Sequence, residues 1–394
     1  MSEDPAAVVR RLYVALATGD GDALTELVHP DFVGRLAEGM PGGVGGEHRG
    51  ADAMIRDGWG GIGRQFAARA EPEHVVALTD GRLLVTGRYT GRGRRGGAPV
   101  DAAFAHVVTV SDGRITALDQ YTDTARWADA APPFTTLRLE IVEGLATITL
   151  DRPEQGNAID PAVTQDLLRA VTLLAEHDGL RAVLITGAGP MFSVGGDITV
   201  FTDTPSEALP DTLRAMISPF HAALDRLASL DAPVIAAVRG AAAGGGLGIV
   251  CTADIVVAAE DAKFTAGYGG IAMVSDGGCS WYLPRMIGLR RAQEMFLTNR
   301  RLTAAEAQDW GLVTTVVPAD DVDAEARRVA EQIAAGPTRS FGAMRRLLRQ
   351  SSDATLRDQH AAEEDSIVAA CRTADTLEGV TAFVERRRPK FTGR

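Results

Sequence analysis

The sequence predicts a two-domain protein in which an α+β domain precedes an α/β domain that ends in helices. In residues 5–121, apolar positions with helical spacing come first and strand-like runs follow, which is the order of an α+β layer domain. From residue 137, strands and helices alternate, which is typical of an α/β domain. From residue 320 onward, the periodicity is almost entirely helical and amphipathic.

Composition limits the class of protein. The 394 residues suffice for two or three domains, and a hydrophobic content of 45% suits packed cores. We expect no membrane segment, because no apolar run has spanning length, and no signal peptide at the start MSEDPAAVVRRLY. The cysteines have no metal-ligand spacing and predict a reducing, cytoplasmic location. A net charge of −12 argues against nucleic acid as a partner, and the Ala-, Gly- and Arg-rich composition indicates a bacterial source.

The predicted N-terminal elements begin with two helices within residues 5–28, broken at Gly19–Asp22 and ended by His29–Phe32. A glycine-rich loop over Gly39–Gly50 follows, and then a helix over Ala51–Phe66. An Asp112-Gly113 hairpin turn joins the last two strands. The predicted strands are His74–Leu78, Arg82–Thr90, Asp101–Val110 and Ile115–Tyr121.

The segment ADAAPP, residues 128–133, is the predicted linker, because its two prolines resist both helix and strand. The predicted division of the chain is an α+β domain over 1–127, the linker over 128–133, an α/β core over 134–320 and a helical region over 321–394.

The C-terminal elements start with a hairpin around Glu143-Gly144 and continue with alternating helices and strands. The predicted strands are Leu137–Val142, Leu145–Leu150, Ala182–Thr186, Val234–Val238 and Ile255–Ala258. The predicted helices are Ala162–Glu176, Asp211–Leu230, Leu247–Ala253, Ala324–Ala335, Ser340–Gln350, Leu356–Ala370 and Thr376–Arg387.

Two glycine-rich turns follow predicted strands and offer free backbone N–H groups. GAGPMFSVGGD, residues 187–197, follows one strand, and Gly244–Gly246 follows another. Such turns attract negative charge, and glycine leaves the backbone open to a ligand. The spacing fits neither a P-loop nor a dinucleotide site. Two such turns can together hold one oxygen, as an acyl-transfer or enolate site requires. The alternative is that these glycines only form tight turns.

Several motifs resemble the enoyl-CoA hydratase/isomerase (crotonase) superfamily. They are Asp151-Arg152-Pro153 with Asn157-Ala158, then Phe192–Asp197, then Gly240 with Gly244–Gly246, and finally Ala382–Phe391. The resemblance covers residues 134–394. It implies a right-handed spiral of ββα units with a C-terminal helical trimerisation region. It also implies an acyl-CoA substrate, with coenzyme A as part of the substrate and no tightly bound cofactor or metal.

Carried onto this chain, the family's two oxyanion N–H groups fall at Gly196 and Gly245. The two hydratase glutamates fall at Gly248 and Tyr268, which argues against hydratase activity because hydration needs both carboxylates. Asp276, before Gly277-Gly278 and Trp281-Tyr282-Leu283-Pro284, resembles the isomerase branches. A single carboxylate suffices for a 1,3-proton shift, and apolar neighbours including Met273, Val274, Trp281 and Tyr282 would suit it. The alternative is that Asp276 only shapes the turn.

The resemblance also implies substrate-binding positions around this site. Val194, Asp197, Ile198 and Thr199 would border the coenzyme A slot, with Asp197 mainly structural at a helix start. Lys390 and Phe391 would reach the nucleotide, from this chain or from a neighbouring subunit; the alternative is a solvated terminal lysine. Tyr268 and Trp281 would form walls of the acyl pocket; the alternative for Tyr268 is a hydrogen bond donated to a substrate oxygen.

The N-terminal segments around Arg11–Tyr13, His29–Phe32 and Asp112–Ala125 resemble the cone-shaped fold of SnoaL-type polyketide cyclases and ketosteroid isomerases. That fold hosts enzymes, binding modules and dimerisation units, so it fixes no function. A pocket would be lined by Tyr13, Trp59, His106, Asp119 and Tyr121. The alternative, an ordinary core tyrosine and histidine, is favoured by the helical spacing, and we assign no catalysis here.

Three hypotheses follow. The first is an acyl-CoA isomerase, acting on a coenzyme A or carrier-protein thioester, with an appended cone-fold domain. The second is a biosynthetic tailoring isomerase or cyclase, in which an open N-terminal pocket also binds or converts the substrate. The third is a non-catalytic binding or scaffold protein, against which Asp276 argues. Both resemblances imply a homo-oligomer, a trimer or a hexamer, and no nucleic-acid or membrane partner.

Overall fold

The computed structural model describes residues 4–94, 97–131 and 133–394. Its contacts divide the chain into two compact units, Met1–Thr135 and Thr136–Arg394. The predicted linker overlaps helix α5, Thr124–Ala130, because Ala130 is fully buried in the N-terminal core. Only the last part of the predicted linker therefore leaves the N-terminal secondary structure. Among the described residues, no helix has the length and apolar character needed to cross a membrane.

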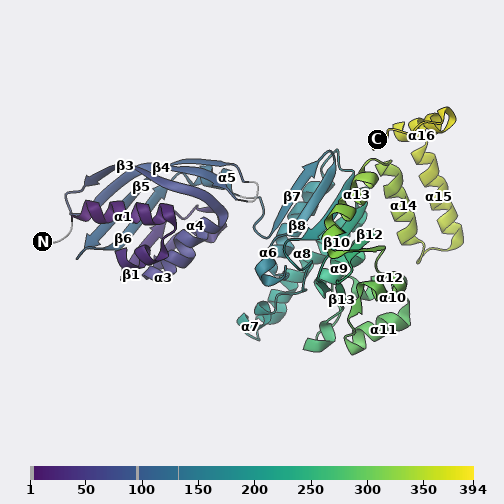
Figure 1. The fold of residues 1–394 in the computed structure, drawn as a ribbon, viewed down its shortest axis with the longest axis horizontal. Coiled ribbons are helices and arrows are strands. Elements are labelled where there is room, and N and C mark those ends of the chain that lie inside the picture. Colours follow the sequence, from purple (N-terminus) through teal and green to yellow (C-terminus); the bar gives the residue numbers. More distant parts are fainter. Residues whose placement is uncertain (1–3, 95–96, 132) are drawn as a thin grey trace. The chain divides into compact units, whose positions relative to one another are not determined.

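The N-terminal unit is a curved six-stranded sheet with helices packed on it, in the order β2-β1-β6-β5-β4-β3 (Figure 1). Helix α1 lies along one face, and it buries Val8, Val9, Leu12 and Tyr13. This unit matches the predicted α+β layer. Its elements are α1 Pro5–Thr18, α2 Gly21–Leu27, β1 Val28–Leu36, β2 Gly46–Arg49, α3 Ala51–Ala53, a π-helical turn Met54–Trp59, α4 Gly60–Gln65, β3 Phe66–Ala77, β4 Leu83–Gly93, β5 Pro99–Ser111, β6 Arg114–Thr122 and α5.

Two strands of the N-terminal unit, β1 and β2, were not predicted from the sequence. Residues 29–32, expected to end a helix, lie in β1, which pairs in parallel with β6. The register shifts between Val28 and Val33, around Pro30, so the two-residue alternation that marks a strand is broken there. Strand β2 lies in the predicted glycine-rich loop, and β3 begins at Phe66 rather than at His74.

The C-terminal unit contains a six-stranded sheet, β15-β12-β10-β9-β8-β7, and a three-stranded sheet, β11-β13-β14. All neighbours in the larger sheet are parallel except the predicted hairpin β7–β8. Its strands are β7 Leu137–Val142, β8 Leu145–Leu150, β9 Ala182–Gly187, β10 Val234–Val238, β12 Ile255–Ala259 and β15 Thr315–Val317. The smaller sheet, which was not predicted, consists of β11 Ala241–Ala243, β13 Lys263–Thr265 and β14 Leu302–Thr303.

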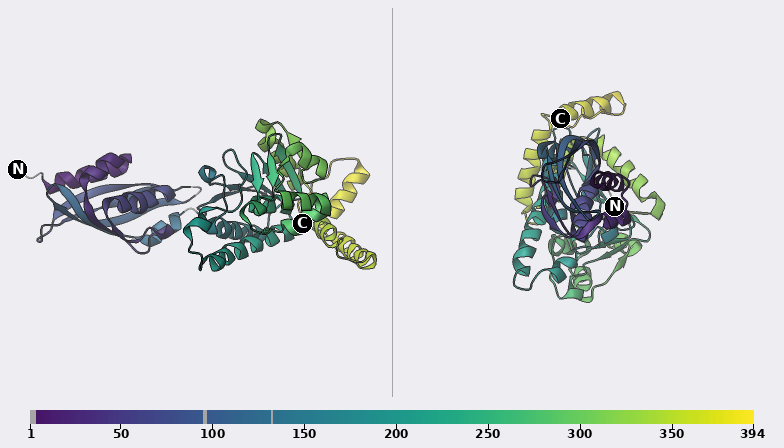
Figure 2. Two further views of the ribbon diagram at one scale, coloured as in Figure 1. Left: turned by 90° about the horizontal axis from the view of Figure 1, so that it is seen from below. Right: turned by 90° about the vertical axis from the view of Figure 1, so that its left-hand side faces the viewer.

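The helices of this unit cover the sheets and then continue as a C-terminal tail. The covering helices are α6 Pro161–Ala175, α7 Thr199–Asp203, α8 Leu209–Ser229, α9 Gly245–Thr252, α10 Cys279–Ile287, α11 Leu289–Thr298, α12 Ala304–Trp310 and α13 Val322–Ala334. The tail helices are α14 Thr338–Gln350, α15 Leu356–Ala370 and α16 Ala374–Glu385. Helix α15 buries none of its residues, and α16 exposes Leu377, Val380, Phe383 and Val384. In Figure 2, α15 and α16 extend away from the larger sheet.

Candidate active site

A cavity of about 330 Å³ in the C-terminal unit brings both predicted glycine turns together with Asp276. Among its lining residues, Asp276 alone has a charged side chain. The rest of the wall is mainly apolar. Its larger apolar side chains come from Ile159, Val194, Phe201, Leu213, Met216, Ile217, Phe220, Ile271, Met273 and Val274. A carboxylate in such an apolar cavity suits proton abstraction from carbon.

Each of the two turns holds a glycine with positive φ directly before the predicted oxyanion glycine. Gly195 has a φ of 95° and precedes Gly196, and Gly244 has a φ of 50° and precedes Gly245. A Cβ atom on Gly195 would also lie 2.8 Å from the carbonyl oxygen of Ala243. These conformations favour glycine and turn the backbone into the cavity.

The amides of Gly196 and Gly245 are available to a ligand. Both glycines line the cavity, and Gly245 is the first residue of α9, where an N–H has no intrahelical acceptor. Within the described residues, neither amide donates a hydrogen bond, whereas the neighbouring amides of Gly195 and Gly244 do. Two unpaired donors lining one cavity are what an oxyanion hole requires, so the predicted role of these two amides stays a prediction that the cavity allows.

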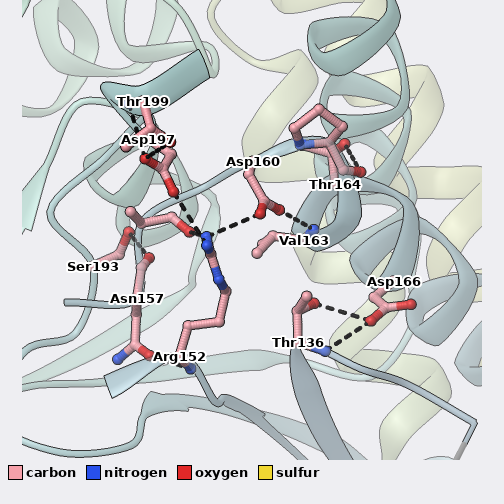
Figure 3. Close-up of polar contacts among 12 residues, drawn as sticks. Thr136, Arg152, Asn157, Asp160, Val163, Thr164, Asp166, Ser193, Asp197 and Thr199 are labelled. Carbon is pink, nitrogen blue, oxygen red and sulfur yellow. Dashed lines mark hydrogen bonds and ion pairs between the residues drawn. The ribbon is translucent and has the colours of Figure 1, made fainter. Parts of the chain in front are cut away.

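A polar network around Arg152 braces the first turn (Figure 3). The Arg152 guanidinium lies 3.2 Å from carboxylate oxygens of both Asp160 and Asp197, and it donates to the Ala158 carbonyl at 2.6 Å. Burial opposes ionisation of Asp197, but hydrogen bonds from Thr199 and Arg152 outweigh it, and the pKa of Asp197 is lowered. Asp197 is thus a structural anion, as the sequence indicated.

Asn157 and Ser193 also stabilise the first glycine turn through hydrogen bonds to its backbone. The Asn157 amide nitrogen donates to the carbonyls of Ala188 and Met191, at 2.9 and 2.7 Å. The Ser193 hydroxyl donates to the Asn157 carbonyl at 2.9 Å and accepts the Gly195 N–H at 3.2 Å. The Asp-Arg-Pro and Asn-Ala motifs therefore act by fixing the backbone that presents Gly196.

Asp276 lies on the loop between β13 and α10, and Tyr268 holds this loop. The Tyr268 hydroxyl donates to the Asp276 carbonyl at 3.1 Å. Burial, together with nearby Cys279 and Asp276, strongly raises the pKa of Tyr268, so its hydroxyl stays a donor. Tyr268 lines the cavity as predicted, but its hydroxyl is engaged by the backbone of this loop.

Backbone atoms of Gly277 occupy the space beside Gly248, the position at which the first hydratase glutamate falls. A Cβ atom on Gly248 would lie 2.6 Å from the carbonyl oxygen of Gly277 and 3.0 Å from its Cα. Such a contact is too short for any side chain without displacing the loop. The loop that carries Asp276 therefore occupies the space that a second carboxylate would need.

His221 is the one neighbour of Asp276 that the sequence analysis did not identify. Its Nε2 lies 2.5 Å from Asp276 Oδ1, and the Gly277 N–H donates to the same nitrogen at 3.4 Å. The His221 side chain is 46% exposed, and the Asp276 side chain is 25% exposed. A single histidine on a long helix carries no local signal, so only the fold identifies this contact.

The other predicted substrate-binding residues fall in three places. Val194 lines the cavity, while Ile198 and Thr199 follow the first turn outside the lining. Lys390 and Phe391 lie after α16 and outside the cavity of this chain; the Lys390 N–H donates to Glu378. Their predicted contact with the nucleotide stays a prediction.

Trp281 was wrongly placed in the wall around Asp276. Helix α10 starts at Cys279, so its rotation carries Trp281 and Tyr282 away from the cavity and toward α14. There the guanidinium of Arg285 lies 4.1 Å from the centroid of the Trp281 ring. Met273 and Val274, the other two residues expected in that wall, do line the cavity.

The five residues of the predicted N-terminal pocket do not converge. Along β6, Leu118 and Gln120 face the core, so Asp119 and Tyr121 alternate onto the other face. Asp119 pairs with Arg35 at 3.1 Å, and Tyr121 is exposed. Trp59 packs against Phe32 at the edge of the core.

Tyr13 and His106 instead belong to a closed polar cluster in the N-terminal core. The hydroxyls of Tyr13 and Tyr89 lie 2.7 and 2.9 Å from Nδ1 and Nε2 of His106. The Gln120 amide donates to the Tyr89 hydroxyl at 2.6 Å and accepts the Ala37 N–H at 3.3 Å. Burial lowers the pKa of His106 to about 3, so the imidazole is neutral near pH 7. These side chains are satisfied by one another.

The fold and the cavity agree with the protein families that the chain matches. Residues 140–394 match the enoyl-CoA hydratase/isomerase family, and residues 9–118 match a SnoaL-like domain. The chain therefore belongs to the enoyl-CoA hydratase/isomerase family, with a SnoaL-like domain at its N-terminal end. The predicted crotonase fold and cone fold are both confirmed.

Three similar proteins illustrate the range of this family. The 1,2-epoxyphenylacetyl-CoA isomerase of Escherichia coli K12 is 34% identical over 64% of this chain and 97% of its own length. The 4-chlorobenzoyl coenzyme A dehalogenase-2 of an Arthrobacter species is 33% identical over 63% of this chain and 90% of its own. The crystal structure of an enoyl-CoA hydratase from Polaromonas sp. JS666 has a TM-score of 0.62 and 32% identity, covering 65% of this chain and 99% of that one.

Proposed function

We propose that the protein is an acyl-CoA isomerase that moves a double bond from the 3-enoyl to the 2-enoyl position. The observation that carries this proposal is that one carboxylate, Asp276, lines the same cavity as the unpaired amides of Gly196 and Gly245. A 1,3-proton shift needs one base and one oxyanion hole, and in this proposal Asp276 is the base and the two amides are the oxyanion hole. A similar protein named as a CoA-thioester isomerase adds support.

In the proposed reaction, the thioester oxygen accepts hydrogen bonds from the two amides. Asp276 removes a proton from C2, and the electron pair of the C2–H bond moves into a dienolate whose charge rests on that oxygen. The protonated Asp276 then gives a proton to C4, and the double bond settles between C2 and C3. Each oxyanion donor is typically worth about 3 kcal/mol of transition-state stabilisation.

Hydration is the reaction that this site supports least. Hydration needs a base that activates water and an acid that protonates the α-carbon. Asp276 is the only carboxylate in the described lining, and the backbone of Gly277 closes the space beside Gly248. The reaction proposed is therefore the one that a single carboxylate can complete.

The thioester carrier and the assembly are part of the same proposal. We infer a coenzyme A thioester, bound near Val194, Ile198 and Thr199, with Lys390 and Phe391 contacting the nucleotide. The exposed apolar residues of α16 fit burial in a homo-oligomer such as a trimer. Asp119 and Tyr121 lie on the face of β6 opposite the core that holds Tyr13 and His106, which supports the simple isomerase over the tailoring hypothesis.

An ultraviolet assay with 3-hexenoyl-CoA tests this function. We expect the conjugated 2-enoyl thioester to accumulate with the wild type and the signal to be lost in Asp276→Asn, which keeps the shape but removes the base. Chromatography of the products separates isomerisation from hydration, because a hydratase would also form the 3-hydroxy thioester. Equal rates in both proteins would contradict the assignment of Asp276.

A second candidate function rests on the contact between Asp276 and His221 and on the similarity to a dehalogenase. An ionised carboxylate can attack an aryl carbon that bears a halide, with the thioester oxygen taking the negative charge. That charge returns to the ring as the carbon–halogen bond breaks and the halide ion leaves, and water can then hydrolyse the aryl ester to a phenol and the free carboxylic acid. Halide release from 4-chlorobenzoyl-CoA would identify this activity. Absence of halide, together with turnover of 3-hexenoyl-CoA, would exclude it.

A further inference from the structure

We propose that His221 relays protons between Asp276 and solvent, so that the hydrogen added at C4 of the product comes from water. This inference rests on the proposed isomerase function and adds a path for the proton. A simple 1,3-shift with one base needs no histidine, because the carboxylate could return the same proton that it removed. The His221–Asp276 contact is therefore unexplained by the basic mechanism.

The contact is short and specific. His221 Nε2 lies 2.5 Å from Asp276 Oδ1, which is shorter than the about 2.7–2.9 Å usual for a nitrogen–oxygen hydrogen bond with charged partners. The Gly277 N–H also points at this nitrogen, at 3.4 Å. Accepting from Gly277 requires a lone pair on Nε2, whereas donating to an ionised Asp276 requires a hydrogen there. The geometry thus accommodates both positions of one proton, on the carboxyl group or on the imidazole.

The location of His221 fits a relay better than a base acting on the substrate. Asp276 lines the cavity, but His221 is absent from its described lining. The His221 side chain is 46% exposed, nearly twice as exposed as that of Asp276 at 25%. The imidazole therefore lies behind the carboxylate as seen from the substrate, with the rest of its ring in contact with water. On the path from the cavity to solvent, the carboxylate of Asp276 therefore comes first and the imidazole of His221 second.

The proton transfers balance without any other reactant. Asp276 takes the C2 proton as the C–H bond breaks, and the proton passes to Nε2 as the imidazole releases another proton to water. The same steps in reverse bring a solvent proton to Asp276. That proton forms the new C4–H bond with the electron pair of the dienolate. The net reaction is still an isomerisation, with one hydrogen of the product taken from water.

Isomerisation of 3-hexenoyl-CoA in D2O tests the relay. The product is isolated early in the reaction, and its deuterium content at C4 is measured by mass spectrometry. We expect one solvent deuterium in most wild-type turnovers. In His221→Gln we expect about tenfold less, because an amide can hold Asp276 but does not accept and release protons near pH 7. His360→Gln, on the exposed face of α15, is the matched control and should behave as the wild type.

Two results would overturn the relay. One is a wild-type product without solvent deuterium, and the other is equal deuterium content in the wild type and His221→Gln. If 3-hexenoyl-CoA is not converted, the proposed function has failed, and exchange of the C2 hydrogens of phenylacetyl-CoA in D2O then tests the relay without isomerisation. Exchange that slows in His221→Gln supports the relay; exchange that is absent or unaffected by the variant overturns it.

A spectroscopic measurement tests the shared proton without any substrate. A hydrogen held between Asp276 and His221 should give a far-downfield proton resonance in the wild type. The resonance should disappear in His221→Gln and in Asp276→Asn while the remaining spectrum is kept. Its absence from the wild type at low temperature and near-neutral pH would contradict the proposal.

Discussion

The two units of this protein differ in whether their polar groups are paired with one another. In the N-terminal core, Tyr13, Tyr89, His106 and Gln120 hydrogen-bond to one another. In the C-terminal cavity, the amides of Gly196 and Gly245 have no acceptor among the described residues. The described buried side-chain atoms without a hydrogen-bond partner also all belong to the C-terminal unit, in Thr186, Arg239, Ser275, Asn299 and Thr338.

This difference separates a stabilising cluster from a binding site. A closed cluster gains its hydrogen bonds when the domain folds, so it has nothing left to offer a ligand. Unpaired donors in an apolar cavity carry a cost that a bound oxygen can remove. We therefore expect substitutions in the C-terminal cavity to change activity and substitutions in the N-terminal cluster to change stability.

Replacing one buried or partly buried ionisable residue in each unit should give the largest difference in activity between two variants. We expect Asp276→Asn to lower kcat for 3-hexenoyl-CoA by about 1000-fold, within the usual range for loss of a general base. His106→Gln should leave kcat within about twofold, because a satisfied core group makes no substrate contact. Steady-state kinetics of both variants, with circular dichroism to check folding, measures this contrast. Activity that falls with His106 and survives without Asp276 would reverse the assignment.

Adding one methyl group to a glycine in each unit should give the next largest effect. A Cβ atom on Gly196 or on Gly63 meets no atom within 4 Å, so both alanine variants should fold. Gly196→Ala, however, puts the methyl into the cavity beside the oxyanion amide, and we expect kcat/KM to fall by about 100-fold. Gly63→Ala, in helix α4, should keep full activity. Unchanged kcat/KM in Gly196→Ala would contradict the position of the oxyanion hole.

Loss of the Tyr268 hydroxyl should have a moderate effect through the position of Asp276. We expect Tyr268→Phe to lower kcat by about fivefold, since one hydrogen bond of about 1 kcal/mol holds the loop. Because the hydroxyl binds the Asp276 carbonyl rather than the substrate, KM should change little. Tyr282→Phe, outside the cavity, is the control. A rise in KM with constant kcat would instead indicate direct substrate binding by Tyr268.

The N-terminal cluster should make stability depend on pH. The pKa of His106 is about 3 in the folded state against 6.5 in the unfolded chain, so only the unfolded state binds a proton between these values. The wild type should therefore lose about 1.4 kcal/mol for each pH unit as the pH falls below 6.5, relative to His106→Gln. Hydrogen exchange of β5 amides at several pH values measures the difference between the two proteins. A constant difference would show that His106 is not buried and neutral.

Much of the fold could be predicted because its signals are local. The hairpin β7–β8, strand β10 and helices α13 to α16 follow from apolar spacing and turn residues. Strands β1 and β2 could not, because Pro30 and a register shift interrupt the first and glycines surround the second. The three-residue strands β11 and β13 are too short to show a period, and they form through long-range pairing, β11 with β13 and β13 with β14.

The candidate site likewise has residues with a local sequence signal and residues without one. The two glycine turns and Asp276 have sequence motifs, and the structure brings all three to one cavity. His221 lies far from Asp276 in the sequence, and one histidine among helical residues gives no sign of its partner. Trp281 was placed by its nearness to Asp276 in sequence, but the start of α10 at Cys279 turns it toward α14. Sequence distance does not determine which side of a helix faces a cavity.

A crystal structure of the protein with hexanoyl-CoA, a saturated thioester that cannot isomerise, would show where the thioester binds. We expect the thioester oxygen within hydrogen-bonding distance of the amides of both Gly196 and Gly245, with C2 facing the Asp276 carboxylate. A thioester bound in the N-terminal unit, or in the groove between α10 and α14, would contradict this expectation.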